Sequence, residues 1–202
     1  MSANNSNESA AATVAPAATV VLMREAEVDE LEVLLLRRNA RLVFHGGHWV
    51  FPGGRLDAED YAAAEGGLEY PAAIQAAVRE TYEEAGITIN QTDLIHLAHW
   101  TTPPGPPRRF CTWFFLCPLR QPVEVQIDND EILEYRWLTP TDALAESADG
   151  NLTLPRPTLI TLTDLAAYKQ LDVLLAEFST RQVRVFPENS RYFRPREMGC
   201  PI

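Results

Sequence analysis

Three glutamates, Glu80, Glu83 and Glu84, lie close together in the segment RETYEEAGI, which runs from Arg79 to Ile87. On a helix, side chains three and four residues apart share a face, so these carboxylates form one stripe. Like charges at this spacing repel by roughly a few tenths of a kcal/mol per pair when exposed, and by more in a cleft, where screening is weak. A divalent cation removes the repulsion, and Mg²⁺ prefers such hard oxygen ligands. The spacing alone is compatible with a metal site and equally with a solvated acidic face.

A helix over residues 71–85 must position this stripe. Pro71 is a favoured first helical residue, and Gly86 is a favoured residue just beyond a last turn. A second face follows the i, i+3, i+4, i+7, i+11 spacing that predicts packing against a core. Its members are Ile74, Ala77, Val78, Thr81 and Ala85.

The rest of the chain alternates strand-forming and helix-forming segments. The β-rich runs 19–23 and 31–38 predict a hairpin, and 94–100, 109–116 and 132–138 predict further strands. The turn Pro52–Gly53–Gly54 precedes an irregular stretch over 55–70, helices are expected from 140 and within 157–178, and 179–202 reads as irregular. This order lacks strict βαβ regularity and predicts an α/β fold with a mixed-sheet sandwich.

Composition narrows the function classes. A net charge of −11 over 202 residues argues against a non-specific grip on nucleic acid or an anionic membrane, because both need basic patches. No apolar run reaches the length of a membrane span. The three cysteines, Cys111, Cys117 and Cys200, show no metal-site spacing and predict a reducing, cytoplasmic location without structural disulfides. Residues 1–17, rich in Ser, Asn and Ala, are expected to form a disordered tail rather than a signal peptide.

The segment RETYEEAGI matches the second half of the Nudix box, R-E-U-x-E-E-x-G-U, where U is a bulky apolar residue; Thr81 departs at the first U. WVFPGG upstream and EILEYRWLTPTDAL downstream are similar to the segments that flank the box in Nudix hydrolases. The resemblance implies a Nudix-type mixed-sheet α/β/α sandwich over residues 18–146. Residues 147–202 would then be a C-terminal helical extension and irregular tail packed on the same domain.

The first half of the box departs from the family pattern, G-x5-E-x7-R-E. Asp60 occupies the glutamate position counted forward from Gly54, whereas Pro71 occupies it counted back from Arg79. The segment 55–78 separates Gly54 from Arg79 and is longer than the pattern allows, so the loop 55–70 is enlarged. Three residues stay candidates for the first acid of the box: Asp57, Asp60 and Glu69.

The enlarged loop and the segment LLLRR resemble the Nudix branch that includes a peroxisomal coenzyme A diphosphatase. This resemblance implies a metal-dependent hydrolase that cleaves a diphosphate linkage in a nucleoside diphosphate derivative, with coenzyme A or acyl-coenzyme A as candidate substrates. A Nudix-fold sensor that binds a nucleotide without hydrolysing it is the alternative. The intact glutamates of REx2EE favour catalysis. The expected partner is a small-molecule diphosphate rather than nucleic acid or membrane, and a homodimer stays open.

The resemblance also assigns roles. It implies metal ligands at Glu80, Glu83, Glu84 and the carbonyl of Gly54, for Mg²⁺ with Mn²⁺ as the alternative, and it implies that Arg79 holds a box glutamate. The general base comes from the box, at Glu83, or from a later segment, where Glu131 and Glu134 are both candidates. Substrate phosphate would meet arginines at strand ends, namely Arg37, Arg38 and Arg109.

Overall fold

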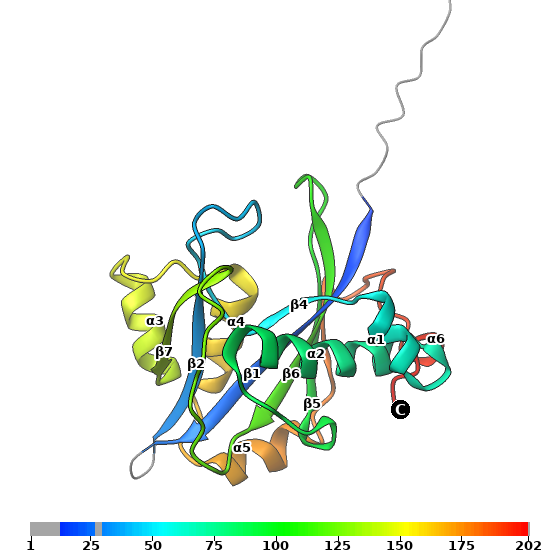
Figure 1. Cartoon of the computed structure of the whole chain (residues 1–202). Helices are drawn as coiled ribbons and strands as arrows, with labels where there is room; N and C mark the ends of the chain where they lie inside the picture. Colours follow the sequence, from blue (N-terminus) through cyan, green and yellow to red (C-terminus); the bar gives the residue numbers. More distant parts are fainter. Residues whose placement is uncertain (1–12, 27–29, 202) are drawn as a thin grey trace, which may run out of the picture.

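The structure is a computed structural model that describes residues 13–26 and 30–201. Within them, a mixed sheet of eight strands forms the centre of the molecule (Figure 1). The strands are β1 (Val14–Glu25), β2 (Leu31–Arg38), β3 (Trp49–Val50), β4 (Gly53–Arg55), β5 (Ile95–Thr101), β6 (Arg109–Pro118), β7 (Ile132–Leu138) and β8 (Arg184–Phe186).

Strand β1 runs through the middle of this sheet. It pairs antiparallel with β2, as the predicted hairpin requires, and parallel with β6 over its length from Val14 to Met23. Strand β5 then pairs antiparallel with β6 and parallel with β8, while β7 pairs antiparallel with β2 and β4 with β1. The mixture of parallel and antiparallel neighbours confirms the predicted mixed sheet.

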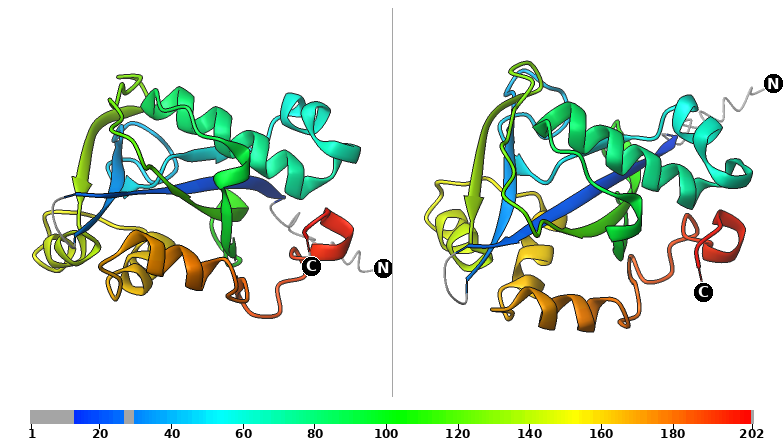
Figure 2. Two further views of the ribbon diagram at one scale, coloured as in Figure 1. Left: turned by 90° about the horizontal axis from the view of Figure 1, so that it is seen from below. Right: turned by 60° about the horizontal axis from the view of Figure 1, so that its bottom comes forward.

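Helices cover both faces of the sheet, which Figure 2 shows in its left view. One face carries α2 (Glu69–Ala85), next to α1 (Ala58–Ala63). The other face carries α3 (Pro140–Ala148), α4 (Arg156–Leu165) and α5 (Leu171–Phe178). The predicted α/β class, with a sheet between two helical layers, is confirmed. The described residues also form three short helices: η1 (Glu65–Gly67), η2 (Gln91–Asp93) and α6 (Pro195–Met198).

Strand alternation divides the core in two. Leu34 and Leu36 of β2 pack in the cluster beneath α2, whereas Val33 and Leu35 pack in the cluster that contains residues of α3, α4 and α5. Successive side chains of a strand point to opposite faces. Therefore Arg38, at the end of β2, continues the α2 face.

Helix α2 starts two residues earlier than predicted. Its first residue is Glu69 rather than Pro71, and the proline is tolerated because the first-turn N–H groups have no partner within a helix. Its end is as predicted: Gly86 has φ 68° and donates its N–H to the carbonyl of Tyr82 at 2.8 Å. Of the predicted core face, Ala77, Thr81 and Ala85 are buried, while Ile74 and Val78 are half-buried.

Three expectations of irregular chain are wrong. Residues 14–17 belong to β1 because β6 and β4 pair with their backbone, and the expected tail at 1–12 lies outside the described residues. The stretch 55–70 contains α1, η1 and the start of α2, and 179–202 contains β8 and α6. In the first and third cases the partner strands are distant in sequence, which local composition does not reveal. No helix in the described part of the chain is long and apolar enough to cross a membrane.

Candidate active site

Arg79 on α2 is the hub of the acidic stripe. Its Nη1 donates to Glu80 Oε1 at 2.9 Å and to Glu83 Oε2 at 3.0 Å. Its Nη2 donates to the carbonyl of Arg55, in β4, at 3.0 Å. One guanidinium therefore joins two box glutamates to the strand that follows the turn.

The remaining donors of Arg79 bind Asp60. Nε donates to Oδ1 at 3.1 Å and Nη2 to Oδ2 at 2.8 Å, which makes a two-pronged ion pair. Asp60 is 4% exposed and also accepts the backbone N–H of Asp57 at 2.8 Å. That bond closes the capping box of α1. The hydrogen bond to Asp60 is the largest cause that raises the pKa of Arg79 above its usual value.

This contact separates the three candidates for the first acid of the box. Asp57 comes only to 3.9 Å of Arg79 and is exposed, and Glu69 instead accepts the indole N–H of Trp113. Asp60 keeps the spacing of the pattern from Gly54, so the extra residues lie between Asp60 and Arg79. They form the rest of α1, η1 and the lengthened start of α2.

The turn Gly53–Gly54 lies directly against the carboxylates. The N–H of Gly53 donates to Glu84 Oε2 at 2.9 Å. A Cβ on Gly54 would lie 2.2 Å from Glu80 Oε1. Only glycine therefore fits at this position without moving the carboxylate. The backbone of the turn and the box helix therefore meet at one place, and the role of the Gly54 carbonyl as a metal ligand stays a prediction.

Glu84 is the most buried of the box glutamates. It is 4% exposed, and burial raises its pKa to about 8, although the Gly53 N–H and Arg38 oppose the shift. Burial also raises the pKa of Glu80. A bound cation would offset the desolvation and the mutual repulsion of these two neighbouring carboxylates. Hard oxygen donors and a close glycine turn fit a divalent ion such as Mg²⁺.

Arg38 bridges the box to the loop before β7. Its Nη1 lies 3.3 Å from Glu84 Oε1, and its Nη2 lies 3.3 Å from Glu131 Oε2. The side chains of Glu83 and Glu131 are about half exposed, at 53% and 54%, so both reach solvent at the edge of the buried pair. Of the two later candidates for the base, Glu131 is therefore the one connected to the stripe.

Arg37 and Glu134 lie on the other face of the sheet. They are register partners in β2 and β7 and form an ion pair of 2.8 Å. With Arg136 and Glu146 they line a polar cavity of about 310 Å³ beside α3. Strand alternation directs both side chains away from α2 and the box glutamates. The expected roles of Glu134 as base and of Arg37 with substrate phosphate stay predictions.

Arg109 is also engaged elsewhere. Its Nε and Nη2 both donate to the carbonyl of Thr102, across the β5–β6 loop, at 3.1 and 3.0 Å. Its guanidinium lies 5.8 Å from the ring centroid of Tyr192. In the described residues, Arg109 makes no ion pair with the acidic stripe. Its predicted role with substrate phosphate stays a prediction.

Comparison with known proteins follows the same lines as this geometry. A sequence profile of the NUDIX domain matches residues 13–156, well over half of the chain. The chain belongs to the NUDIX family. A Caenorhabditis elegans protein whose name places it among the nudix hydrolases is 29% identical over 70% of this chain and 58% of its own length. Acyl-coenzyme A diphosphatase NUDT19 of Xenopus laevis is 22% identical over 72% of this chain and 62% of its own length.

The crystal structure of a NUDIX hydrolase from Alicyclobacillus acidocaldarius has the same fold. It matches with a TM-score of 0.71 and 26% identity, over 84% of this chain and 99% of that chain. The predicted resemblance to the coenzyme A diphosphatase branch of the NUDIX family is confirmed by the NUDT19 relative. The chain nevertheless spans less than two thirds of the length of these two curated relatives.

Replacing Asp60 tests the ion pair between Arg79 and Asp60. Asp60→Asn removes the buried charge that Arg79 binds through two hydrogen bonds, and we expect the free energy of unfolding to fall by about 2 kcal/mol. Asp57→Asn is the matched control, because Asn is an equally good N-cap; its loss should stay under about 0.5 kcal/mol. Urea denaturation measures both, and equal losses would contradict the assignment of Asp60.

Replacing Gly54 tests the contact between turn and helix. The methyl group of Gly54→Ala must displace the Glu80 carboxylate, whose atoms lie at the far end of a flexible side chain. We expect the metal-free melting temperature to change little and the Mg²⁺-dependent rise in melting temperature to shrink. Thermal denaturation with and without millimolar Mg²⁺ measures this, and an undiminished rise would exclude Gly54 from the site.

Proposed function

We propose that this protein is a Mg²⁺-dependent hydrolase that cleaves the diphosphate linkage of a nucleoside diphosphate derivative, with coenzyme A or acyl-coenzyme A as substrate. The observation that carries the proposal is that Glu80 and Glu84 meet the Gly53–Gly54 turn while Arg79 joins Glu83 to Glu80 beside it. The coenzyme A class is supported by the name of the NUDT19 relative. The intact carboxylates favour catalysis over a sensor that only binds nucleotide.

The reaction adds water to one phosphorus atom and breaks its bond to the bridging oxygen. The carboxylates of Glu80, Glu83 and Glu84 and the carbonyl of Gly54 would hold Mg²⁺ or Mn²⁺. Bound there, such ions would neutralise phosphate oxygens and would lower the pKa of a water molecule. Arg79 fixes the directions of Glu80 and Glu83 from behind, since Asp60 and the Arg55 carbonyl occupy its other donors. For coenzyme A the products are a phosphopantetheine and an adenosine bisphosphate.

Glu131 is proposed as the general base. Its side chain is half exposed, so water reaches it, and Arg38 holds it near the buried Glu84. A carboxylate in this position can accept a proton from the attacking water. Glu83 is also partly exposed but is engaged by Arg79, which favours a role as ligand. Arg38 acts as a positioning residue for both Glu84 and Glu131. Its positive charge can also attract the substrate phosphate.

A product assay with Glu84→Gln tests the function. Coenzyme A, acyl-coenzyme A, NADH, ADP-ribose and a nucleoside triphosphate are incubated with wild type and variant, with Mg²⁺ or with chelator, and products are separated by chromatography. Wild type should cleave the coenzyme A compounds only with metal. Glu84→Gln should lose activity by orders of magnitude, because metal charge at the transition state is worth several kcal/mol. Wild-type turnover in the variant would contradict the metal site.

The same assay separates the alternatives. The metal-free stability of Glu84→Gln should match wild type closely, because Gln keeps the size and helix propensity of Glu and removes a charge that burial makes costly. Activity confined to nucleoside triphosphates would reject the coenzyme A class and keep the hydrolase. Tight nucleotide binding with no product under any metal would favour the sensor.

The choice of base is tested by two matched variants on one segment. Glu131→Gln should lower kcat by about 10²–10⁴-fold while the Mg²⁺-dependent rise in melting temperature is kept. Glu134→Gln, on the opposite face of the sheet, should leave both unchanged. Steady-state kinetics and thermal denaturation are the measurements. A large loss in Glu134→Gln, or none in Glu131→Gln, would contradict the assignment.

A further inference from the structure

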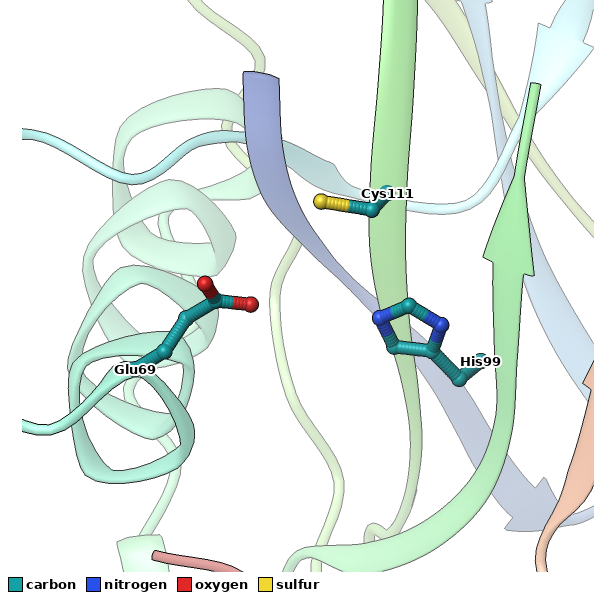
Figure 3. A group of neighbouring side chains, drawn as sticks. All are labelled: Glu69, His99 and Cys111. Atoms are coloured by element: carbon teal, nitrogen blue, oxygen red, sulfur yellow. The ribbon is translucent and has the colours of Figure 1, made fainter. Parts of the chain in front are cut away.

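A second group of ligand-type side chains lies at the other end of α2. Glu69 comes from the first turn of the helix, His99 from β5 and Cys111 from β6. One ligand atom of each lies within 4.8 Å of the other two. Figure 3 shows the three side chains pointing toward one another from the helix and the two strands. His99 and Cys111 share a face of the sheet, because Thr101, two residues after His99, is the register partner of Cys111.

His99 is an unusual core residue. It is fully buried, and within the described residues neither Nδ1 nor Nε2 has a hydrogen-bond partner. A buried polar group without a partner costs about 1–3 kcal/mol, so such groups are rare in native structures and call for an explanation. Burial lowers the pKa of His99 to about 3, which leaves the ring neutral and a lone pair available for a metal. A bound metal ion satisfies that lone pair.

The two other members are held beside His99, Glu69 by a hydrogen bond and Cys111 by burial. Trp113 donates its indole N–H to Glu69 Oε1 at 3.0 Å, which orients the carboxylate as outer hydrogen bonds orient metal ligands. Cys111 is 4% exposed. Phe193 of the C-terminal segment packs on the His99 ring, with centroids 4.8 Å apart. His99 and Cys111 are thus buried, and Glu69 is half-buried.

This group is separate from the Nudix box. Glu69 opens α2, whereas Glu80 lies about three turns further along the same helix. The two groups also differ in chemistry. The box offers oxygen atoms only, the donors that Mg²⁺ takes. The second group offers one oxygen, one imidazole nitrogen and one sulfur, a set that suits Zn²⁺.

We propose that Glu69, His99 and Cys111 bind a thiophilic divalent cation, Zn²⁺, with a fourth position left for water. The charges balance, because a carboxylate, a thiolate and a neutral imidazole carry two negative charges between them. Binding transfers the thiol proton of Cys111 to solvent. The ion would connect the first turn of α2 to β5 and β6 and thereby fix the helix whose far end carries the box.

The test uses the full chain, with excess Mg²⁺ present to occupy the box. Co²⁺ replaces Zn²⁺ as a spectroscopic probe, since a thiolate ligand gives an intense charge-transfer absorption that oxygen ligands do not. Wild type and Glu84→Gln should both show this absorption at a single equivalent of Co²⁺. Cys111→Ser should lose it. Zn²⁺ at about 100-fold over its Kd should raise the melting temperature of wild type by about 5–10 °C.

Matched controls locate the site among the three thiols. Cys117→Ser removes another buried thiol, and Cys200→Ser removes the thiol that lies 3.9 Å from Nδ1 of His96. Both should keep the absorption. Circular dichroism without metal checks that Cys111→Ser is folded, and His99→Gln provides a second variant that should lose the Zn²⁺-dependent shift. No absorption in wild type, or its loss in Cys200→Ser instead of Cys111→Ser, would overturn the proposal.

Discussion

The ion pair between Arg79 and the buried Asp60 is the interaction on which the site depends. A carboxylate that is 4% exposed is stable as a charge only when paired, and Asp60 receives two hydrogen bonds from one guanidinium. The same guanidinium has donors left for Glu80, Glu83 and the backbone of β4. The Arg79–Asp60 ion pair therefore helps to orient Glu80 and Glu83, and it connects α1 to these box glutamates. Without Arg79, Glu80 and Glu83 would have no common counterion in the metal-free protein.

Strand alternation then decides which charges join the site. Arg37 and Arg38 are neighbours in sequence, yet one pairs with Glu134 beside α3 and the other with Glu84 and Glu131 beside α2. The two core clusters fix this division, because a slip of one residue in β2 would move its leucines between faces. The packing of the β2 leucines in the two core clusters thus decides which arginine lies beside the box glutamates. The polar cavity beside α3 is lined by acids and arginines that pair with each other, which leaves little net charge to attract a phosphate.

Helix α2 carries a group of ligand-type side chains near each of its two ends. Its last turns carry hard oxygen ligands against a glycine turn, and its first turn carries Glu69 against a buried histidine and cysteine. Ligand hardness keeps the two groups chemically distinct, since Mg²⁺ selects oxygen and Zn²⁺ accepts nitrogen and sulfur. Anchoring of the first turn would hold the whole helix in register. The position of the box would then depend on the rigidity of this one helix.

Several of these features could be predicted from the sequence, because they depend only on interactions between residues close together in the chain. The stripe of glutamates, the end of the helix at Gly86 and the hairpin of β1 and β2 follow from periodicity and turn chemistry over a few residues. The sequence did not identify the first acid of the box. The choice between Asp57, Asp60 and Glu69 depends on how α1 and α2 place these residues relative to Arg79. The choice between Glu131 and Glu134 depended on the register of β7 against β2. Glu69, His99 and Cys111 are separated by long stretches of chain and show no ligand spacing. Only the packing of α2 on β5 and β6 brings them together, because distance in space is set by tertiary contacts and not by position along the chain.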